Sequence, residues 1–283
     1  EYVQYLAEIG ADAVLISDLG VFSLARETVP SLPIHISTQA NTVNWAAVEA
    51  WHKLGAARVV LAREMSRDEI REVRRRTSAA LEMFVHGAMC MSYSGRCLIS
   101  SYLTGRDANR GSCTHPCRWR YRLVEEERPG QYFPVEEDAQ GTYFFNSKDL
   151  CLLPHLPDVI ESGVDSLKIE GRMKSVHYVA SVTKTYRTAI DAYVNDPAHF
   201  AVRPEWRAEL DKVSHRAYTA GFFYGQTGAE DQIYEHASYI QTSVFVGVVE
   251  AYDPVTGWGL VEQRNHMKVG QEIEVFQPKG DTF

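Results

Sequence analysis

The stretches AVLIS, residues 13–17, and RVVLA, residues 58–62, are short, continuous and rich in β-branched side chains. Runs of this kind indicate strands that are buried on both faces, as in a parallel sheet. Further runs of the same type predict strands at 34–37, 81–86, 143–146 and 166–170. Helical patterns follow most of these strands, at 20–28, 42–54, 67–76, 150–162 and 176–194. The alternation of strand and helix predicts a parallel sheet covered by helices.

A helical pattern at residues 1–9 precedes the first predicted strand. We therefore expect a TIM-type (β/α)8 barrel lacking its first two strands, with the six predicted strands as strands three to eight. An open doubly wound sheet is the alternative. Residues 1–238, with a further helix at 205–216, are assigned to this incomplete barrel, and residues 87–142 to a cysteine-rich insertion. Residues 239–283, with strands at 244–251, 259–263 and 272–276, are assigned to a small C-terminal β-barrel module that we expect to be cut short.

The composition favours a cytoplasmic protein with a large core. The 283 residues are 45% hydrophobic, yet no stretch approaches the roughly 20 continuous apolar residues of a membrane span, and no signal peptide is visible. The formal charge is −8, but residues 86–122 hold six arginines against one acid, Asp107. Tyr93, Tyr102, Trp119 and Tyr121 lie among these arginines, a mixture suited to stacking on the bases of RNA. A solvated arginine-rich loop anchored by aromatic residues is the alternative.

The cysteines of the insertion are the strongest chemical signal. Cys90, Cys97, Cys113 and Cys117 lie within 28 residues, separated by six, fifteen and three residues. This spacing matches neither the paired cysteines of zinc ribbons nor the runs of ferredoxins. Clustered thiols in a chain without secretory features more often bind metal than form disulfides. The residues thus predict a metal ion or an iron–sulfur cluster, with disulfides or independent core cysteines as alternatives.

In a (β/α)8 barrel the residues just past the strand ends line the active site. The candidates for substrate binding at these positions are Gln39, Asn41, Arg63, Glu64, Asn146, Lys148, Asp149, Arg172 and Lys174. Arg96 and Arg118 of the basic segment join them. Lys148, Lys168, Arg172 and Lys174 predict a site for a carboxylate or phosphate, because the last loops of such barrels often bind anions. Ion pairs of these bases with Asp149 and Glu170 are the alternative.

The candidate catalytic residues are His86, Lys168 and Glu170, at the ends of two predicted strands. His86, Glu82 and Cys90 also suggest a nucleophile with a base, as in a cysteine peptidase. A structural histidine on an apolar strand is the alternative for His86.

Four segments carry a resemblance to a known family: EMFVHGAMCMSYSGRCLIS (82–100), TGRDANRGSCTHPCRW (104–119), NSKDLCLL (146–153) and DSLKIEGRMKS (165–175). The chain resembles peptidase family U-thirty-two (U32) over nearly its whole length. These collagenase-like peptidases include tRNA and rRNA hydroxylation proteins of bacteria. The resemblance implies a catalytic barrel with a C-terminal β-barrel extension.

The activity that the resemblance implies is an oxygen-independent C5-hydroxylation of the wobble uridine of tRNA. It implies prephenate as co-substrate and a 4Fe-4S iron–sulfur cluster on Cys90, Cys97, Cys113 and Cys117. Prephenate is a dicarboxylate, which agrees with the predicted anion site. Two alternatives stay open at this point: a metal-dependent or cysteine peptidase, and an RNA-binding module with a structural zinc site.

Overall fold

The computed structural model describes residues 1–283 apart from 91, 120–146, 228–230, 232–238, 279 and 281–283. The chain divides into two compact units. The first unit comprises residues 1–172 and 216–238, and the second comprises residues 173–215 and 239–283. The predicted strand at 143–146 lies outside the described residues.

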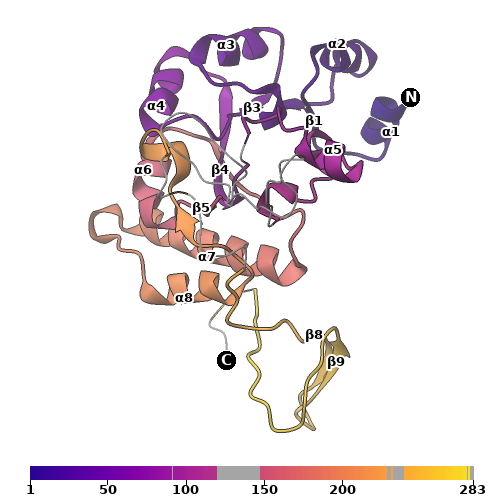
Figure 1. Ribbon diagram of the computed structural model, residues 1–283, viewed down its shortest axis with the longest axis vertical. Coiled ribbons are helices and arrows are strands. Elements are labelled where there is room, and N and C mark those ends of the chain that lie inside the picture. The colour runs from indigo at the N-terminus through magenta and orange to yellow at the C-terminus, as the bar shows by residue number, and fades with distance from the viewer. Residues whose placement is uncertain (91, 120–146, 228–230, 232–238, 279, 281–283) are drawn as a thin grey trace, which may run out of the picture. The chain divides into compact units, whose positions relative to one another are not determined.

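The first unit begins with alternating helices and strands (Figure 1). Their bounds are α1 Tyr2–Glu8, β1 Val14–Ile16, α2 Leu19–Thr28, β2 Ile34–Ile36, the 3₁₀ turn η1 Thr38–Ala40, α3 Trp45–Lys53, β3 Arg58–Val60, α4 Arg67–Arg76 and β4 Ala80–Ala88. The unit continues with α5 Ile99–Thr104, η2 Ala108–Arg110, η3 Pro116–Arg118, β5 Asp149–Cys151, η4 Leu153–His155, α6 Leu156–Glu161, β6 Ser166–Ile169, β7 Tyr218–Thr219 and η6 Gly221–Tyr224.

Capping side chains mark the first residues of three helices, α2, α3 and α4. The Asp18 carboxylate accepts a hydrogen bond from the backbone N–H of Val21 (2.8 Å) and begins α2. The Asn44 side chain accepts one from Ala47 and begins α3, three residues later than the pattern predicts. Ser66 and Glu69 form a reciprocal capping box at α4. These contacts satisfy backbone N–H groups that a helix start would otherwise leave without partners.

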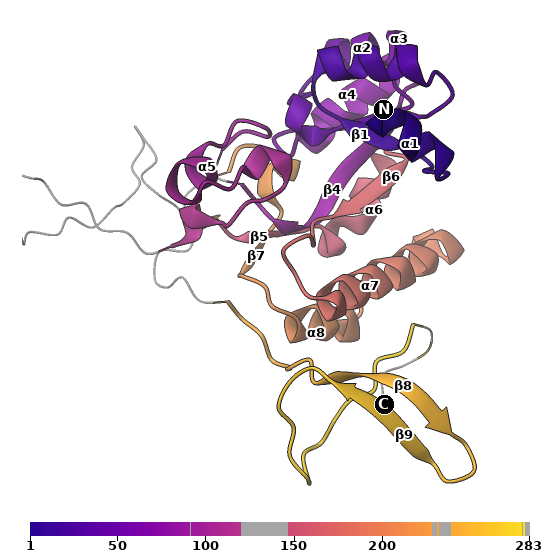
Figure 2. The same cartoon turned by 90° about the vertical axis from the view of Figure 1, so that its right-hand side faces the viewer.

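Strands β1, β2, β3, β4 and β6 form a parallel run in that order. The predicted strands at 13–17, 34–37, 58–62, 81–86 and 166–170 are confirmed. One face of this run is apolar, and Ile36, Val59 and Leu81 on it are fully buried. Helices α2, α3 and α4 lie on one side of the strands (Figures 1 and 2). The mixed α/β class with a parallel sheet and helices is confirmed.

The predicted helix at 150–162 is wrong over its first half. Residues 149–151 form β5, which pairs antiparallel with His86–Ala88 at the end of β4 and parallel with β7. Pro154 and Pro157 explain the difference, because proline is tolerated in the first turn of a helix and not in its interior. The helix α6 therefore begins only at Leu156. An apolar run such as LCLL fits a strand as well as a buried helix.

A bend in β4 lets this strand pair on both sides. The register with β6 shifts between Phe84 and His86. Gly87 follows with φ 110°, and a side chain there would collide with the backbone carbonyl of Glu170. Glycine is the residue that this backbone angle and close approach allow. The bend carries the end of β4 toward the cysteine-rich segment.

The second unit contains α7 Val176–Asn195, η5 Pro197–His199, α8 Pro204–Lys212 and the antiparallel pair β8 Gly247–Asp253 and β9 Trp258–Gln263 (Figure 2). The small C-terminal antiparallel sheet is confirmed. The strand predicted at 272–276 is not formed, since these residues have no regular structure. The helix predicted at 205–216 ends at Lys212. Of the helices that the structure describes, none combines the length with the apolar composition that a bilayer crossing demands.

Leu81→Ala should lower the free energy of unfolding by about 2–5 kcal/mol, because it leaves a cavity in the fully buried middle of the sheet. Leu15→Ala is the matched control, since Leu15 on the edge strand β1 is 53% exposed and its loss should cost within about 0.5 kcal/mol. Urea denaturation followed by circular dichroism measures both. Equal losses for the two variants would contradict the assignment of β4 to the core.

Candidate functional site

The first of the four predicted cysteine ligands, Cys90, lies just beyond the end of β4, and the others follow in the segment up to Cys117. Cys90 is exposed, Cys113 is half-buried, and Cys97 and Cys117 are buried. The thiol of Cys90 forms a hydrogen bond with the sulfur of Cys97, which lowers the pKa of Cys97 to about 5 and raises that of Cys90. Backbone N–H groups of Ile99 and Ser100 also bond to the sulfur of Cys97 and favour its thiolate. Within this pair the contacts favour the thiolate on Cys97 rather than on Cys90.

Of the other two cysteines, Cys117 lies close enough to act on this pair. The charge of Cys117 acts on the pKa of Cys90, and the sulfur of Cys113 accepts a hydrogen bond from the backbone N–H of His115 (3.3 Å). Four thiols are a donor set that suits zinc or an iron–sulfur cluster. Among the described residues, no three His, Cys, Asp or Glu side chains already have ligating geometry. The cysteines thus fit such a group by the chemistry of their thiols, and binding would have to bring their sulfurs together.

Side chains at two strand ends hold the loop between Cys90 and Cys97. The Glu64 carboxylate accepts hydrogen bonds from the backbone N–H (2.8 Å) and the hydroxyl (2.9 Å) of buried Ser94. The Asn41 amide donates to the Ser94 carbonyl (3.1 Å), and the Gln39 amide donates to the carbonyl of Ala108 (3.4 Å). We name Glu64, Asn41 and Ser94 the loop clamp. Three residues predicted to bind substrate, Gln39, Asn41 and Glu64, thus contact the cysteine segment itself.

Backbone geometry tightens the loop clamp. Gly95 has φ +78°, and a side chain there would collide with the backbone of Gln39. Asn41 has φ 55°, in the left-handed region that asparagine tolerates better than most residues. The loop therefore approaches the end of β2 more closely than a side chain at residue 95 would allow.

Arg63 connects the cysteines to the next strand end. Its guanidinium lies 3.8 Å from the Glu170 carboxylate and 3.7 Å from the centre of the Phe84 ring. Burial lowers the pKa of Arg63, whereas the charges of Glu170 and Cys90 act to raise it. Glu170 also accepts a hydrogen bond from the backbone N–H of Arg172 (3.0 Å). Arg63 and Glu170 therefore lie together, and Arg63 supplies positive charge near Cys90.

A second charged group lies within the sheet around Glu82. The buried Glu82 carboxylate accepts hydrogen bonds from Lys168 Nζ (2.9 Å), Arg58 Nη1 (3.2 Å) and Ser166 Oγ (3.0 Å). Burial acts to raise the pKa of Glu82, but the hydrogen bond and charge of Lys168 outweigh it, and the pKa is lowered. Burial and the charge of Arg58 lower the pKa of neighbouring His35. Lys168, a candidate catalytic residue, is thus held by an ion pair.

The four cations of the predicted anion site have different surroundings. Lys168 pairs with Glu82, and the Arg172 guanidinium lies over Gly111 of the cysteine segment and donates to the Arg110 carbonyl (3.4 Å). Lys174 belongs to the second unit, where its Nζ donates to the Ser214 carbonyl (2.6 Å). The Lys148 backbone N–H donates to the carbonyl of Asp231 (3.0 Å). Among these four, the structure brings Arg172 to the cysteines.

His86 and Asp149 are both deeply buried. His86 lies in β4 with its ring 5.3 Å from that of Tyr218. Asp149 is 0% exposed, and its carboxylate accepts a hydrogen bond from the backbone N–H of Arg216 (3.1 Å). The loop position expected for Asp149 is therefore wrong, because this residue starts strand β5. Asn146 and the Arg118 side chain lie outside the described part, and Arg96 is exposed.

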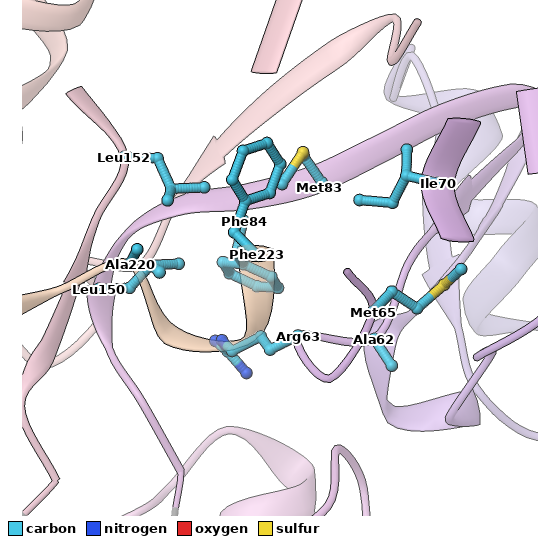
Figure 3. Close-up of a pocket in the computed structure, with 10 residues that line it drawn as sticks. All are labelled: Ala62, Arg63, Met65, Ile70, Met83, Phe84, Leu150, Leu152, Ala220 and Phe223. Carbon is cyan, nitrogen blue, oxygen red and sulfur yellow. The ribbon is translucent and has the colours of Figure 1, made fainter. Parts of the chain in front are cut away.

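A small cavity adjoins Arg63 (Figure 3). It is lined by apolar side chains from β4 and α4 and from residues 150–152 and 220–223. Arg63 is the charged member of the lining that the structure describes, and it already faces Glu170 and Phe84. The cavity is thus a gap in the apolar packing next to Arg63, and the described part of its lining offers no further polar side chain for a ligand.

Sequence patterns did not single out Ser94 or Arg58. Ser94 lies in a glycine-flanked loop, where a serine carries no distinctive signal. For the ion pairs around Glu82, the sequence signal is a glutamate within an otherwise apolar strand. A buried carboxylate needs cationic partners, so such a position predicts nearby lysine or arginine.

Comparison with known sequences places the chain in a family. The sequence model of Peptidase family U32 matches residues 1–233, and that of the Peptidase family U32 C-terminal domain matches residues 241–283. The chain therefore belongs to peptidase family U32, and the resemblance expected from its four motifs is confirmed.

Relatives within this family are RNA-hydroxylating proteins by name. The tRNA hydroxylation protein P1 of Bacillus subtilis is 42% identical over 284 residues, which cover 100% of this chain and 67% of the relative. The tRNA hydroxylation protein P of Escherichia coli is 38% identical over 98% of this chain and 69% of its own length. A 23S rRNA 5-hydroxycytidine synthase of Escherichia coli is 34% identical over 79% of this chain and 34% of its own length.

Glu64→Ala should release the loop clamp, because the Ser94 N–H and hydroxyl both lose their acceptor. Leaving such buried groups without partners costs about 1–3 kcal/mol. Hydrogen exchange of the Ser94 amide should therefore become faster, and Glu64→Gln, with one acceptor oxygen, should fall between Ala and wild type. Glu8→Ala on the exposed side of α1 is the control. Unchanged protection of Ser94 in Glu64→Ala would contradict the clamp.

Glu82→Gln should reduce stability at neutral pH and remove part of its dependence on acid. Because the folded-state pKa of Glu82 is lowered, its ionised form stabilises the fold above its unfolded pKa of about 4.3. That contribution disappears as the pH falls through the lower folded pKa. Urea denaturation from pH 7 down to about pH 3 should show wild type and variant converging. A constant difference across this range would exclude the ion pair as its cause.

Proposed function

We propose that this chain is an RNA-modifying enzyme that hydroxylates C5 of the wobble uridine of tRNA. Its cysteines Cys90, Cys97, Cys113 and Cys117 would hold a 4Fe-4S cluster, and prephenate would be the co-substrate. The observation that carries the proposal is the contact between the thiols of Cys90 and Cys97, in a loop that Glu64 holds at the strand ends. The names of the relatives support RNA hydroxylation as the activity.

The residues of the chain would prepare the thiols for the cluster. When bound, the cluster supplies one-electron redox chemistry. Cys97 is favoured as a thiolate by its hydrogen bonds, and Arg63 places positive charge near Cys90. The loop clamp fixes the segment between these two cysteines. Thiolate ligands and hydrogen-bond donors to them are the features by which proteins retain and tune such clusters.

The carboxylates of prephenate need guanidinium or ammonium groups near the cysteines. Arg172 is exposed and lies over Gly111 of the cysteine segment, and Arg63 lies beside Cys90. A guanidinium binds a carboxylate through two parallel hydrogen bonds. We assign Arg172 the leading role in binding prephenate, with Lys148 and Lys168 as further candidates, and Glu170 and Arg63 as an ion pair that the co-substrate opens. His86, Lys168 and Glu170 remain the proposed catalytic group.

The architecture behind this site is part of the proposal. The parallel run β1–β2–β3–β4–β6 supports a section of a TIM-type barrel, whose active site lies at the carboxyl ends of the strands. The family matches at 1–233 and 241–283 support a division between residues 1–238 and a C-terminal module at 239–283. A tRNA substrate also accords with a cytoplasmic location.

A peptidase is the second candidate, because the family description carries that activity. A cysteine peptidase needs a thiol and an imidazole within hydrogen-bonding reach. The exposed Cys90 bonds to Cys97, and the imidazole of His86 lies buried against Tyr218. These contacts favour the cluster function. Zinc on the same thiols, in an RNA-binding module, is the other alternative for the cysteine site.

Cys90→Ala should abolish both the iron content and the hydroxylation of tRNA, because it removes one of four ligands. Iron and sulfide are quantified after anaerobic purification, and 5-hydroxyuridine is measured by mass spectrometry of the tRNA. Cys151→Ala is the matched control, since Cys151 is buried in β5 and should leave the iron content intact.

Hydroxylation at the wild-type level in Cys90→Ala would refute the proposal. One zinc per chain with no iron would favour the RNA-binding module. Cleavage of gelatin by the wild-type chain, stopped by a thiol blocker, would favour the peptidase.

A further inference from the structure

The short helix α5 and its flanking turns carry large side chains that point into solvent. Tyr102 is 87% exposed, Leu98 71% and Tyr93 61%. Arg96, Arg106 and Arg110 are exposed among them. We name these six residues the α5 ridge. In Figure 2, α5 lies near the carboxyl end of β4, where β4 pairs with β5, and away from helices α2, α3 and α4.

The α5 helix is oriented against the usual hydrophobic pattern. Its buried residue is Ser100, at 0% exposure, whereas Tyr102 and Leu103 face outward. The Ser100 hydroxyl bonds to Thr114 Oγ1 (3.2 Å) and accepts from the Thr114 N–H (3.1 Å). Thr104 Oγ1 bonds to Thr114 as well (3.2 Å). Polar contacts with Thr114 thus hold the buried side of α5, and Tyr102 lies on its exposed side.

The same segment carries local positive charge on an acidic chain. Residues 86–122 contain six arginines and one acidic residue, Asp107, although the whole chain has a charge of −8. Asp107 uses one carboxylate oxygen to accept from the Asn109 N–H (2.8 Å) and lies 3.6 Å from Arg110. Exposed aromatic rings beside guanidinium groups are the combination that binds single-stranded nucleic acid.

The ridge is connected directly to the cysteine site. Tyr93 and Arg96 lie between Cys90 and Cys97, in the loop that Glu64 holds through Ser94. The Asn109 amide donates to the Cys97 carbonyl (2.9 Å), which fixes the turn that carries Arg110. A ligand lying on the ridge therefore comes close to the cysteines.

We propose that the α5 ridge is the docking surface for a single-stranded loop of RNA. Unpaired bases stack on Tyr102 and Tyr93, and Arg96, Arg106 and Arg110 bind the phosphates. Stacked bases next to the loop would place one nucleotide at the cysteine site. This inference rests on the proposed function, because it names the surface by which that site receives its RNA. Base stacking needs an exposed ring with a fixed backbone, which distinguishes this surface from a lipid-binding helix that inserts an apolar face.

Tyr102→Ala should weaken the binding of a fluorescein-labelled single-stranded RNA to the full chain by about tenfold, the typical effect of losing one stacking platform. Tyr102→Phe keeps the ring and should bind as the wild type does. Tyr2→Ala is the matched control, because Tyr2 is also exposed, at 72%, but lies on α1. Fluorescence anisotropy at fixed salt measures all four proteins.

Arg106→Ala and Arg110→Ala should reduce the salt dependence of binding. Each lost phosphate contact lowers the slope of log K against log salt concentration by about 0.7 for a single strand. A duplex RNA of the same length should bind more weakly than the single strand, since its bases cannot stack on tyrosine. Binding of anionic vesicles in preference to RNA would overturn the assignment of the partner.

The outcomes separate the ridge from the proposed activity. Wild-type affinity of Tyr102→Ala for single-stranded RNA overturns the ridge, whatever the iron content of the chain. Weakened binding in Tyr102→Ala and Arg106→Ala, with normal iron content, supports the ridge. That result stands even if the wild-type chain hydroxylates no RNA, in which case the proposed activity alone fails.

Discussion

The double hydrogen bond between the Glu64 carboxylate and Ser94 is the interaction on which the candidate site depends. It joins the end of β3 to a loop without regular structure, and that loop holds Cys90 and Cys97. Asn41 from the end of β2 donates to the same serine. Hydrogen bonds to a carboxylate are stronger than those to a neutral acceptor. Two such bonds from Ser94 therefore let the sheet position a loop that has no regular structure. The ends of the parallel strands thereby fix the position of the loop that carries the thiols of Cys90 and Cys97.

The part of the fold that local patterns encode could be predicted from the sequence. The five parallel strands and the starts of α2 and α4 follow from apolar runs and from capping side chains. In the segment 149–162, Pro154 and Pro157 place the helix start later than the apolar pattern does. The strand at 149–151 could not be predicted, because an apolar run of this length suits a strand or a helix equally, and the choice depends on pairing with distant His86–Ala88. The absent strand at 272–276 is an error of the same kind: its alternation of residues was suitable, but a strand needs a partner.

For the site, residue identity was more predictable than residue role. The cysteines can be proposed as ligands from their clustering alone, since thiols gathered in one segment have few other uses. The polar residues at the strand ends were recognised as a group, but their partners were not visible in the sequence. Glu64 and Asn41 bind the loop, Lys168 is paired with Glu82, and Asp149 is buried in β5. A sequence shows which side chains lie near an active site, whereas their partners depend on how an irregular insertion folds back.

The strand ends and the α5 ridge differ in how their positive charges are paired, and this difference suits them to different ligands. At the strand ends and within the sheet, cations lie beside carboxylates: Arg58 and Lys168 beside Glu82, and Arg63 beside Glu170. Such pairs are nearly neutral from a distance and attract a polyanion weakly. The α5 ridge has three exposed arginines, and residues 86–119 around it contain one acid, Asp107, so the ridge keeps a net positive charge that faces solvent. The ridge is therefore suited to capture a long phosphate backbone, and the paired cations, with Arg172 beside the cysteines, to bind a small carboxylate that can exchange partners at short range.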